Sequence, residues 1–160
     1  ALPIYILSFN PEATSLSLGL YKTGFNETDY SHELPDDILN AQTPNLIINH
    51  FISTLVQEGY LHNHARLYLS SYMIHFRRIR WSVGANWMFY HLVDADMASN
   101  SLSWQWVAST SSNKPYFFNL ENIQKYVPSS LPISNQDNPE LVGTYEELAK
   151  RLFPKQGGIR

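Results

Sequence analysis

Cysteine is absent from this 160-residue sequence, and charged residues are scarce. The lack of cysteine excludes disulfides, a thiolate nucleophile and cysteine-based metal sites. Charged residues make up 16% of the chain and the net charge is −3, whereas a protein that binds nucleic-acid phosphates usually carries a basic excess. No apolar run approaches the roughly 20 residues of a membrane span, and the start, ALPIYILSFNPEA, lacks the basic lead of a secretory signal. We therefore expect a soluble, intracellular protein, in the cytoplasm or an organelle, without a membrane span and without a nucleic-acid partner.

Apolar and aromatic side chains are plentiful, at 44% and 14% of the residues, which suffices for one domain with a sizeable core. Residues 1–43 are predicted to be irregular, with one short helical turn between residues 31 and 40, because prolines and glycines interrupt them. From Pro44 onward, apolar residues recur at helical spacing until Gly59. This pattern predicts a helix that Pro44 opens at its first position and Gly59 ends.

The remainder of the chain also carries helical patterns. Further helices are predicted at residues 62 to about 78, at about 84 to 97, over one or two turns within 100–110, at 119–127, and at 145–153. Pro128 stops the fourth of these, and Thr144 with Glu147 forms a capping box for the last. No strand alternation is present, so the predicted fold class is all-α, with a helical core at 44–128. Residues 129–160 are expected to form a loop, a C-terminal helix and a mobile tail.

In two pairs of candidate functional residues, the members of each pair are two positions apart in the sequence. His62 and His64 would share a face in a strand and could bind a metal, but in a helix they point roughly 200° apart, so we expect no metal site. Asp94 and Asp96 are either a general acid–base pair or ordinary carboxylates at a helix end. Arg66 lies in a predicted apolar region, where an arginine needs a carboxylate partner. We expect it to pair with one of these two aspartates.

The tryptophans and a group of arginines fall close together. All tryptophans of the sequence lie within 26 residues: Trp81, Trp87, Trp104 and Trp106. Indoles in a helical protein are most simply core residues, although indoles near a redox cofactor can pass electrons. The arginines in RRIR, residues 77–80, are expected to be a solvated helix end, where cations suit the helix dipole. A phosphate contact is the alternative.

Three short motifs follow one another along the chain: HNHAR at residues 62–66, DADMASN at 94–100 and WQWVAST at 104–110. They resemble the patterns His-Asn-Arg-x-Arg, Asp-Gly-Asp-x-Ala-x-Asn and Trp-Gln-Trp-Ala-x-x-Thr in the FAD-binding domain of DNA photolyases and cryptochromes. The similar region covers roughly half of the chain, from Gln42 to the KPYF segment and loosely beyond. On this resemblance, residues 44–128 are the helical FAD-binding core. The chain is then the C-terminal half of such a domain, as a truncated stand-alone protein.

The resemblance implies a set of FAD-binding residues: Asn63, Arg66, Asp94, Asp96, Asn100 and Trp104. Arg66 matches the family arginine beside the isoalloxazine ring, which pairs with the aspartate matched by Asp94. Asp96 matches the second aspartate, near the pyrimidine edge of the ring and the ribose. A fixed cation at Arg66 suits a flavin ring that takes on negative charge.

The other matched positions extend this assignment. Asn63 matches a residue that lines the cofactor pocket, and Asn100 matches the residue that faces flavin N5, to which an amide can hydrogen-bond. Trp104 matches the flavin-proximal member of the family's electron-transfer chain, and Trp81 matches the next member outward. Trp106 matches a tryptophan at the lesion pocket.

Several positions depart from the family pattern. The motif arginine that contacts DNA phosphate is His64 here, and the methionine that touches the pyrimidine dimer is Leu67. Ala95 replaces the glycine between the two aspartates. The antenna domain and most of the first half of the cofactor domain are not found in the sequence. TSLSLG, residues 14–19, is only faintly similar to the phosphate loop of that half.

These observations support three functions to different degrees. The first is a small FAD-binding flavoprotein without autonomous DNA repair, with a light or redox response as one form of it. Because half a pocket holds FAD weakly, a protein partner or a homodimer would complete the site. The second is a cofactor-free interaction or assembly subunit that has lost FAD and kept the helical fold. Light-driven DNA repair ranks last, because of the acidic net charge and the departures at His64 and Leu67.

Overall fold

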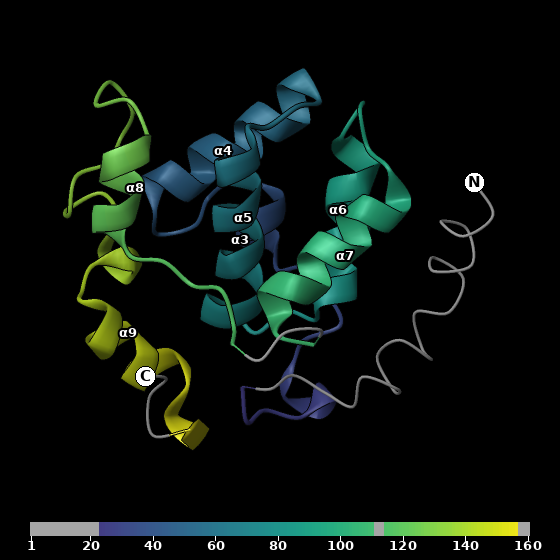
Figure 1. Cartoon of the computed structure of the whole chain (residues 1–160). Helices are drawn as coiled ribbons and strands as arrows, with labels where there is room; N and C mark the ends of the chain where they lie inside the picture. The colour runs from purple at the N-terminus through teal and green to yellow at the C-terminus, as the bar shows by residue number, and fades with distance from the viewer. Residues whose placement is uncertain (1–22, 111–113, 157–160) are drawn as a thin grey trace.

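A computed structural model describes residues 23–110 and 114–156 of the chain (Figure 1). These residues form helices and one isolated β-bridge, between Ser31 and Ile79, which confirms the predicted all-α class. In chain order the elements are η1 (Glu27–Asp29), α3 (Asp36–Leu39), α4 (Leu46–Glu58), α5 (Asn63–Ser71), η2 (Tyr72–Phe76), α6 (Trp81–His91), α7 (Met97–Ala108), α8 (Leu120–Tyr126), η3 (Pro139–Leu141), α9 (Tyr145–Leu152) and η4 (Pro154–Gln156). No helix in the described part of the chain is long and apolar enough to cross a membrane.

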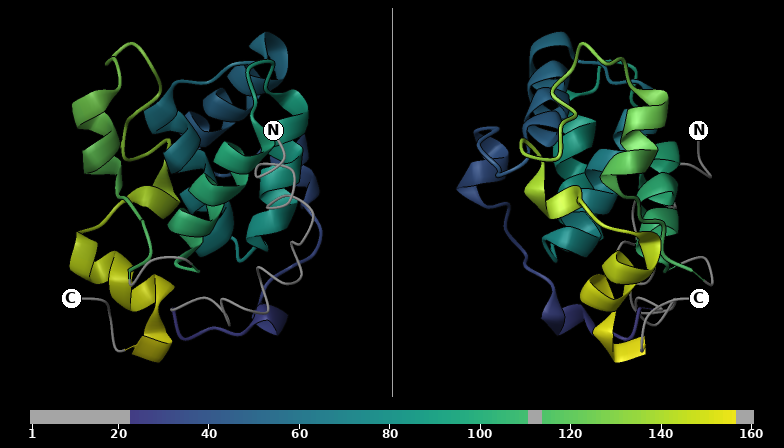
Figure 2. Two further views of the ribbon diagram at one scale, coloured as in Figure 1. Left: turned by 45° about the vertical axis from the view of Figure 1, so that its right-hand side comes forward. Right: turned by 90° about the vertical axis from the view of Figure 1, so that its left-hand side faces the viewer.

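Helix α5 occupies the middle of the molecule, and α4, α6, α7 and α8 surround it (Figures 1 and 2). Its apolar face is fully buried at Leu69, and the burial continues through Tyr72 and Met73 of η2. Val107 of α7 and Ile52 of α4 pack into the same core. The residues that carry chemistry on α5 therefore stand on a helix that is fixed from several sides.

Helix α4 has the predicted end but not the predicted start. Gly59 ends it with a φ of 69°, the left-handed conformation that glycine adopts without a Cβ penalty. The helix begins at Leu46 and its N-cap is Asn45, so the prediction that Pro44 occupies the first helical position is wrong. The Asn45 Nδ2 donates a bond to the Glu140 carboxylate, and its Oδ1 accepts a bond from the Glu140 N–H. These bonds tie the start of α4 to the distant η3 segment.

The predicted helix at 62–78 is divided into two types of helix. His62 caps α5 by accepting a bond from the His64 backbone N–H, and after Ser71 the chain widens into the π-helix η2. Arg78 ends the segment with a φ of 51°. π-Helical turns are uncommon and occur often near functional sites.

The region from 81 to 108 differs most from the prediction. A single helix at 84–97 is wrong: α6 runs Trp81–His91, residues 92–96 form a connection, and α7 runs Met97–Ala108. The one or two helical turns predicted within 100–110 are therefore part of a helix of about three turns. The side chain of Asp96 starts α7 by accepting a 2.9 Å bond from the Ser99 N–H, and that cap separates the two helices.

The C-terminal part follows the prediction more closely. Helix α8 ends before Pro128, and the Thr144 hydroxyl caps α9 by accepting a bond from the Glu147 N–H. The connection between them contains η3 and the buried side chain of Asn138. Lys155 pairs with Asp29 at 2.9 Å, so the C-terminal segment lies against the start of the described chain. The glycine-containing end of the tail, residues 157–160, and the TSLSLG stretch lie outside the described residues.

The arginine cluster is part of the packing rather than a solvated helix end. Arg77 forms a two-bond pair with Asp37, with N–O distances of 2.7 and 2.8 Å. Arg80 pairs with Glu27 at 2.5 Å. The Arg78 guanidinium lies 3.6 Å from the centre of the Phe25 ring. These side chains therefore join the first described residues to the end of η2.

Candidate functional site

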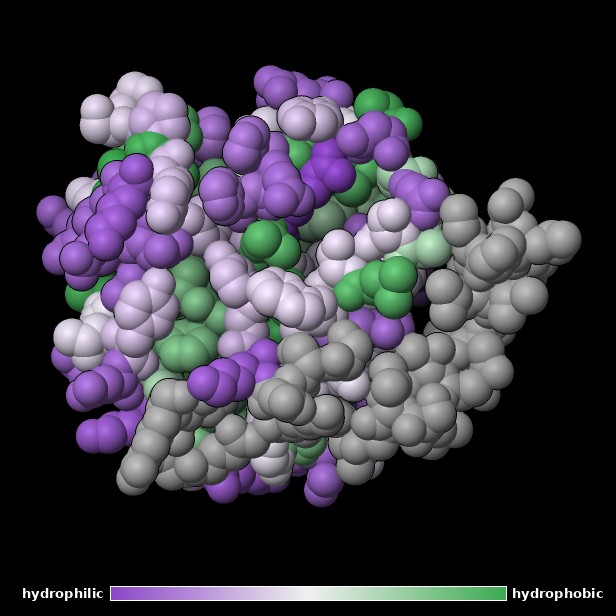
Figure 3. Space-filling view, in the orientation of Figure 1, coloured by the Kyte–Doolittle hydropathy of each residue, from purple (hydrophilic) through white to green (hydrophobic). Residues whose placement is uncertain are grey.

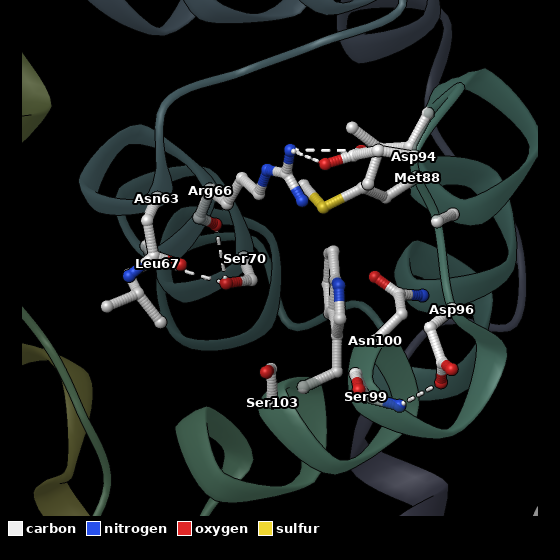
Figure 4. Close-up of a pocket in the computed structure, with 13 residues that line it drawn as sticks. Asn63, Arg66, Leu67, Ser70, Met88, Asp94, Asp96, Ser99, Asn100 and Ser103 are labelled. Atoms are coloured by element: carbon white, nitrogen blue, oxygen red, sulfur yellow. Dashed lines mark hydrogen bonds and ion pairs between the residues drawn. The ribbon is translucent and has the colours of Figure 1, made fainter. Parts of the chain in front are cut away.

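A cavity of about 300 Å³ lies between α5, the 92–96 connection and α7 (Figure 4). All the residues predicted to bind FAD line it: Asn63, Arg66, Asp94, Asp96, Asn100 and Trp104. The structure thus brings together three motifs that are separated along the sequence. Their contact with a flavin stays a prediction.

Arg66 and Asp94 form the ion pair expected from the sequence. The Arg66 Nη2 group lies 3.1 Å from each Asp94 carboxylate oxygen, and its Nε–H donates a 2.6 Å bond to the Leu61 carbonyl. The guanidinium also lies 5.0 Å from the centre of the Tyr60 ring. Because three groups hold it, Arg66 presents a fixed positive charge at the edge of the cavity (Figure 4).

The position of Asp94 depends on the end of α4. The Val93 N–H donates a 2.8 Å bond to the Gly59 carbonyl. A Cβ at Gly59 would lie 2.7 Å from a methyl carbon of Val93, well inside a normal contact of 3.5–4.0 Å between carbons. The exposed Val93 side chain can rotate away from such a Cβ, so glycine is favoured there for its left-handed backbone conformation.

Asp96 has a structural bond in addition to its place in the cavity lining. Its Oδ1 caps α7 through the Ser99 N–H. A carboxylate at a helix N-terminus also interacts favourably with the helix dipole. The same carboxylate is exposed to solvent at the cavity, where it can accept further hydrogen bonds from a hydroxyl-bearing ligand.

Asn100 is oriented by a bond to the neighbouring helix. Its Nδ2 donates a 2.8 Å bond to the Ala85 carbonyl of α6. With the amide nitrogen so engaged, the amide oxygen faces the cavity (Figure 4). The side chain therefore presents a hydrogen-bond acceptor to any ligand there.

Trp104 forms a wall of the cavity and is 2% exposed. Its ring lies directly against α6 at Gly84, where an added Cβ would be 2.3 Å from Cζ3 and 2.5 Å from Cη2. The same Cβ would be 3.3 Å from the Met73 sulfur. Gly84 was expected near the start of a helix, and its actual role is to make room for this indole.

His75 of η2 holds α7 from behind the cavity. Its Nε2–H donates a 2.7 Å bond to the Val107 carbonyl, and the ring is fully buried. Burial lowers the pKa of His75 to about 3, because a charged imidazole would lose its hydration. The residue is therefore neutral at ordinary pH and acts as a fixed hydrogen-bond donor.

Other sequence-predicted residues lie outside the cavity. Trp81 is buried at the start of α6, and Trp106 is 47% exposed with its ring centre 5.5 Å from that of Tyr116. His64 is exposed, and its ring packs on Tyr126, with 5.1 Å between centres. Leu67, the counterpart of the family methionine, does line the cavity.

Sequence reasoning missed part of the lining, which also contains Ser70, Met88, Leu92, Ala95, Ser99 and Ser103. Helical spacing carried a signal for two of these. Ser70 is four residues after Arg66, and Ser103 is three after Asn100, so each shares a helix face with a predicted residue. The lining combines a cation, hydroxyls, an acceptor and an indole, which together suit a planar polar ring.

Comparison with known proteins agrees with this geometry. A family described as the FAD binding domain of DNA photolyase matches residues 23–133. A deoxyribodipyrimidine photo-lyase of Agrobacterium fabrum is 38% identical over 76 residues, which are 48% of this chain and 16% of that protein. The mitochondrial deoxyribodipyrimidine photo-lyase of Saccharomyces cerevisiae is 31% identical over 113 residues, 68% of this chain and 20% of that protein. These matches thus span no more than about a fifth of either relative, and no solved structure matches the chain.

Proposed function

This chain belongs to the family of FAD-binding domains of DNA photolyases, and from that premise we propose that it is a photolyase-like flavoprotein without autonomous DNA repair. The observation that carries the proposal is the convergence of three separate motifs on one cavity, with the Arg66–Asp94 pair at its edge. The described residues contain no cluster of histidine and acidic side chains that could hold a metal.

Each lining residue has a place in FAD binding on this proposal. Arg66 holds a positive charge beside the ring, and Asp94 fixes the direction of that charge. The Asn100 oxygen is available to accept a bond from a protonated ring nitrogen, and the Asp96 carboxylate is available to a ribose or ribityl hydroxyl. Asn63 closes the side of the cavity opposite Asp96 (Figure 4). FAD, when bound, supplies light absorption and electron-transfer chemistry.

The two tryptophans matched to the family's electron-transfer chain support a redox or light response. Trp104 lines the cavity. Trp81 is buried at the start of α6, the helix against which the Trp104 ring packs at Gly84. Both side chains are at most 3% exposed, so each would be shielded from water during electron transfer. On this proposal Trp104 would be the member of an electron-transfer chain next to bound FAD, and Trp81 would be the following member.

The cavity volume limits which part of FAD it can hold. About 300 Å³ is the lower end of the range for sites that bury a small organic ligand, and FAD is a dinucleotide. The ring end of FAD therefore belongs in this cavity, and the adenine end extends beyond the residues that line it. A protein partner or a second copy of the chain would cover the remainder.

The proposal excludes autonomous repair because of two positions. His64 stands where the family has an arginine, and its ring packs against Tyr126 rather than extending as a long cationic side chain. Leu67 presents an aliphatic side chain to the cavity where the family has a methionine. The net charge of −3 further weakens attraction to a phosphate backbone.

FAD binding is tested by the visible flavin absorption of protein that is purified with FAD and then desalted. The variant Asp94→Asn removes the charge that fixes Arg66, and Asp37→Asn is a matched control, because Asp37 forms a similar two-bond pair with Arg77 away from the cavity. We expect a flavin band in the wild type and in Asp37→Asn, and its loss in Asp94→Asn and Arg66→Ala. Equal flavin retention in all four proteins would contradict the assigned site.

A cofactor-free interaction subunit is the second candidate. It is favoured by large apolar side chains on the outside of α6, α7 and their connection, with Tyr90 83% and Val93 82% exposed. Figure 3 shows the apolar groups on this face as separate patches among hydrophilic residues. They do not form the single continuous apolar patch that marks many protein–protein interfaces. A well-folded wild-type protein that retains no flavin would favour this candidate.

A further inference from the structure

A second cavity, of about 410 Å³, lies on the other side of the 60–64 segment from the proposed FAD site. Residues of α4, of the α4–α5 connection and of the end of α8 line it, and its buried floor is formed by Phe51, Leu61 and Ala65. Its volume falls within the range for small-molecule sites. The two cavities have no lining residue in common, because successive residues between 62 and 66 point to different sides of the α5 start.

The wall of this cavity is built from rings. The rings of His62 and His64 lie with centres 5.7 Å apart and planes 28° apart. The expectation that these two side chains point apart on a helix is therefore wrong, because His62 is the N-cap of α5 and precedes its first helical residue. The rings of His64 and Tyr126 lie with centres 5.1 Å apart and planes 26° apart. The three rings form one row of nearly parallel faces that joins the start of α5 to the end of α8. Tyr126, at one end of the row, is 61% exposed, so a further flat ring can stack on it.

The charges of the lining narrow the class of ligand. The cavity has no lysine or arginine in its lining, and Glu58 is its one carboxylate. A phosphate group would therefore meet a negative charge and no fixed positive partner, whereas an amino group can donate to the Glu58 carboxylate. Thr54 and His50 add hydrogen-bonding groups on the α4 side.

We propose that this second cavity binds an uncharged, amino-substituted heteroaromatic ring of nucleobase size, which stacks on the His62–His64–Tyr126 row and donates to Glu58. This site is separate from the proposed FAD site, and the inference does not depend on FAD being bound. Aromatic stacking contributes substantially to the binding of a base, so the ring row provides most of the affinity. Glu58 provides the preference for an amino-bearing, unphosphorylated ligand.

Adenosine is a suitable probe, because it carries an amino-substituted ring and no phosphate. Its binding to the full chain is measured by isothermal titration calorimetry for the wild type, Tyr126→Leu, His64→Leu and Glu58→Gln. Tyr126 and His64 are exposed, so these variants should fold. His62 and Tyr60 are left unchanged because His62 caps α5 and Tyr60 contacts Arg66. Tyr90→Leu, which removes an exposed tyrosine on α6, is the matched control.

We expect adenosine to bind the wild type and Tyr90→Leu equally, and at least tenfold more weakly to Tyr126→Leu. His64→Leu and Glu58→Gln should also weaken it, and Asp94→Asn, which alters the other cavity, should leave it unchanged. Absence of adenosine binding, or binding that Asp94→Asn abolishes and Tyr126→Leu retains, would overturn the proposal. Tighter binding of adenosine monophosphate than of adenosine would overturn the argument from charge.

Discussion

Replacement of Gly84 by alanine tests how α6 and the cavity wall are fitted together. The new methyl carbon would lie 2.3 Å from Cζ3 of Trp104, against a normal carbon–carbon contact of 3.5–4.0 Å. The indole would have to move by more than ~1 Å, although it is only 2% exposed and the cavity borders just part of it. Overpacking of a core costs about 1–3 kcal/mol. Because the contact is so short, we expect the steric cost of Gly84→Ala to lie at the upper end of this range.

Helix propensity acts in the opposite direction, because alanine stabilises a helix interior by about 1 kcal/mol relative to glycine. The net expectation is a loss of about 2 kcal/mol in the free energy of unfolding, or roughly 4–8 °C in Tm for a chain of this size. Urea unfolding and tryptophan fluorescence measure the loss and the displaced indole. Asn86→Ala, at an exposed position of the same helix, is the control and should be neutral or slightly stabilising. A Gly84→Ala protein that is more stable than wild type, with unchanged fluorescence, would refute the packing argument.

Two further predictions concern His75 and Asp96, which hydrogen-bond to the last and the first turn of α7. Because burial lowers the pKa of His75 to about 3 from its ordinary value of 6.5, the unfolded chain binds a proton below pH 6.5 that the folded chain does not. The contribution of His75 to the free energy of unfolding is therefore fully present above pH 6.5. It should fall by about 2–3 kcal/mol between pH 6.5 and about 4.5, at roughly 1.4 kcal/mol per pH unit. In the His75→Gln variant, the urea midpoint should not show this dependence on pH. Asp96→Ala should lower the stability of the protein by about 1 kcal/mol, because it removes the cap of α7, whereas Asp96→Asn should keep the cap. An equal loss of stability in the two variants, measured by thermal unfolding, would show that the cap is not the cause.

Local signals in the sequence predicted the fold well where the chain obeys local rules. Gly59 and Pro128 marked helix ends, and Thr144 marked a helix start. The errors arose where tertiary contacts decide. Gly84 resembles a helix terminus until the facing indole is known, and Asp96 reads as one more carboxylate until its bond to the Ser99 N–H is seen. The π-helical turn at Tyr72–Phe76 leaves no recognisable mark in the residue pattern.

The sequence motifs identified the candidate residues of the site, and the structure added the contacts between them. The predicted apolar surroundings of Arg66 indicated a carboxylate partner, the family resemblance implied Asp94, and the structure shows that pair. Sequence alone could not show that the Asn100 amide nitrogen is engaged by the Ala85 carbonyl, because that contact joins two helices whose boundary was misplaced.

The residues that stabilise the fold are not the residues proposed to bind the ligand. Loss of flavin in a binding-site variant can therefore be separated from loss of folding. The Arg66 and Asp94 side chains are 24% and 50% exposed, and an exposed pair of this kind contributes at most about 1 kcal/mol to folding. The core that holds the helices consists instead of fully buried apolar residues such as Leu69 and Val107. Asp94→Asn should therefore keep the wild-type Tm while losing the flavin. The comparison is made on flavin-free protein, because bound flavin itself raises the Tm of the wild type. A lower Tm of flavin-free Asp94→Asn than of flavin-free wild type would instead mean that the pair acts through the fold.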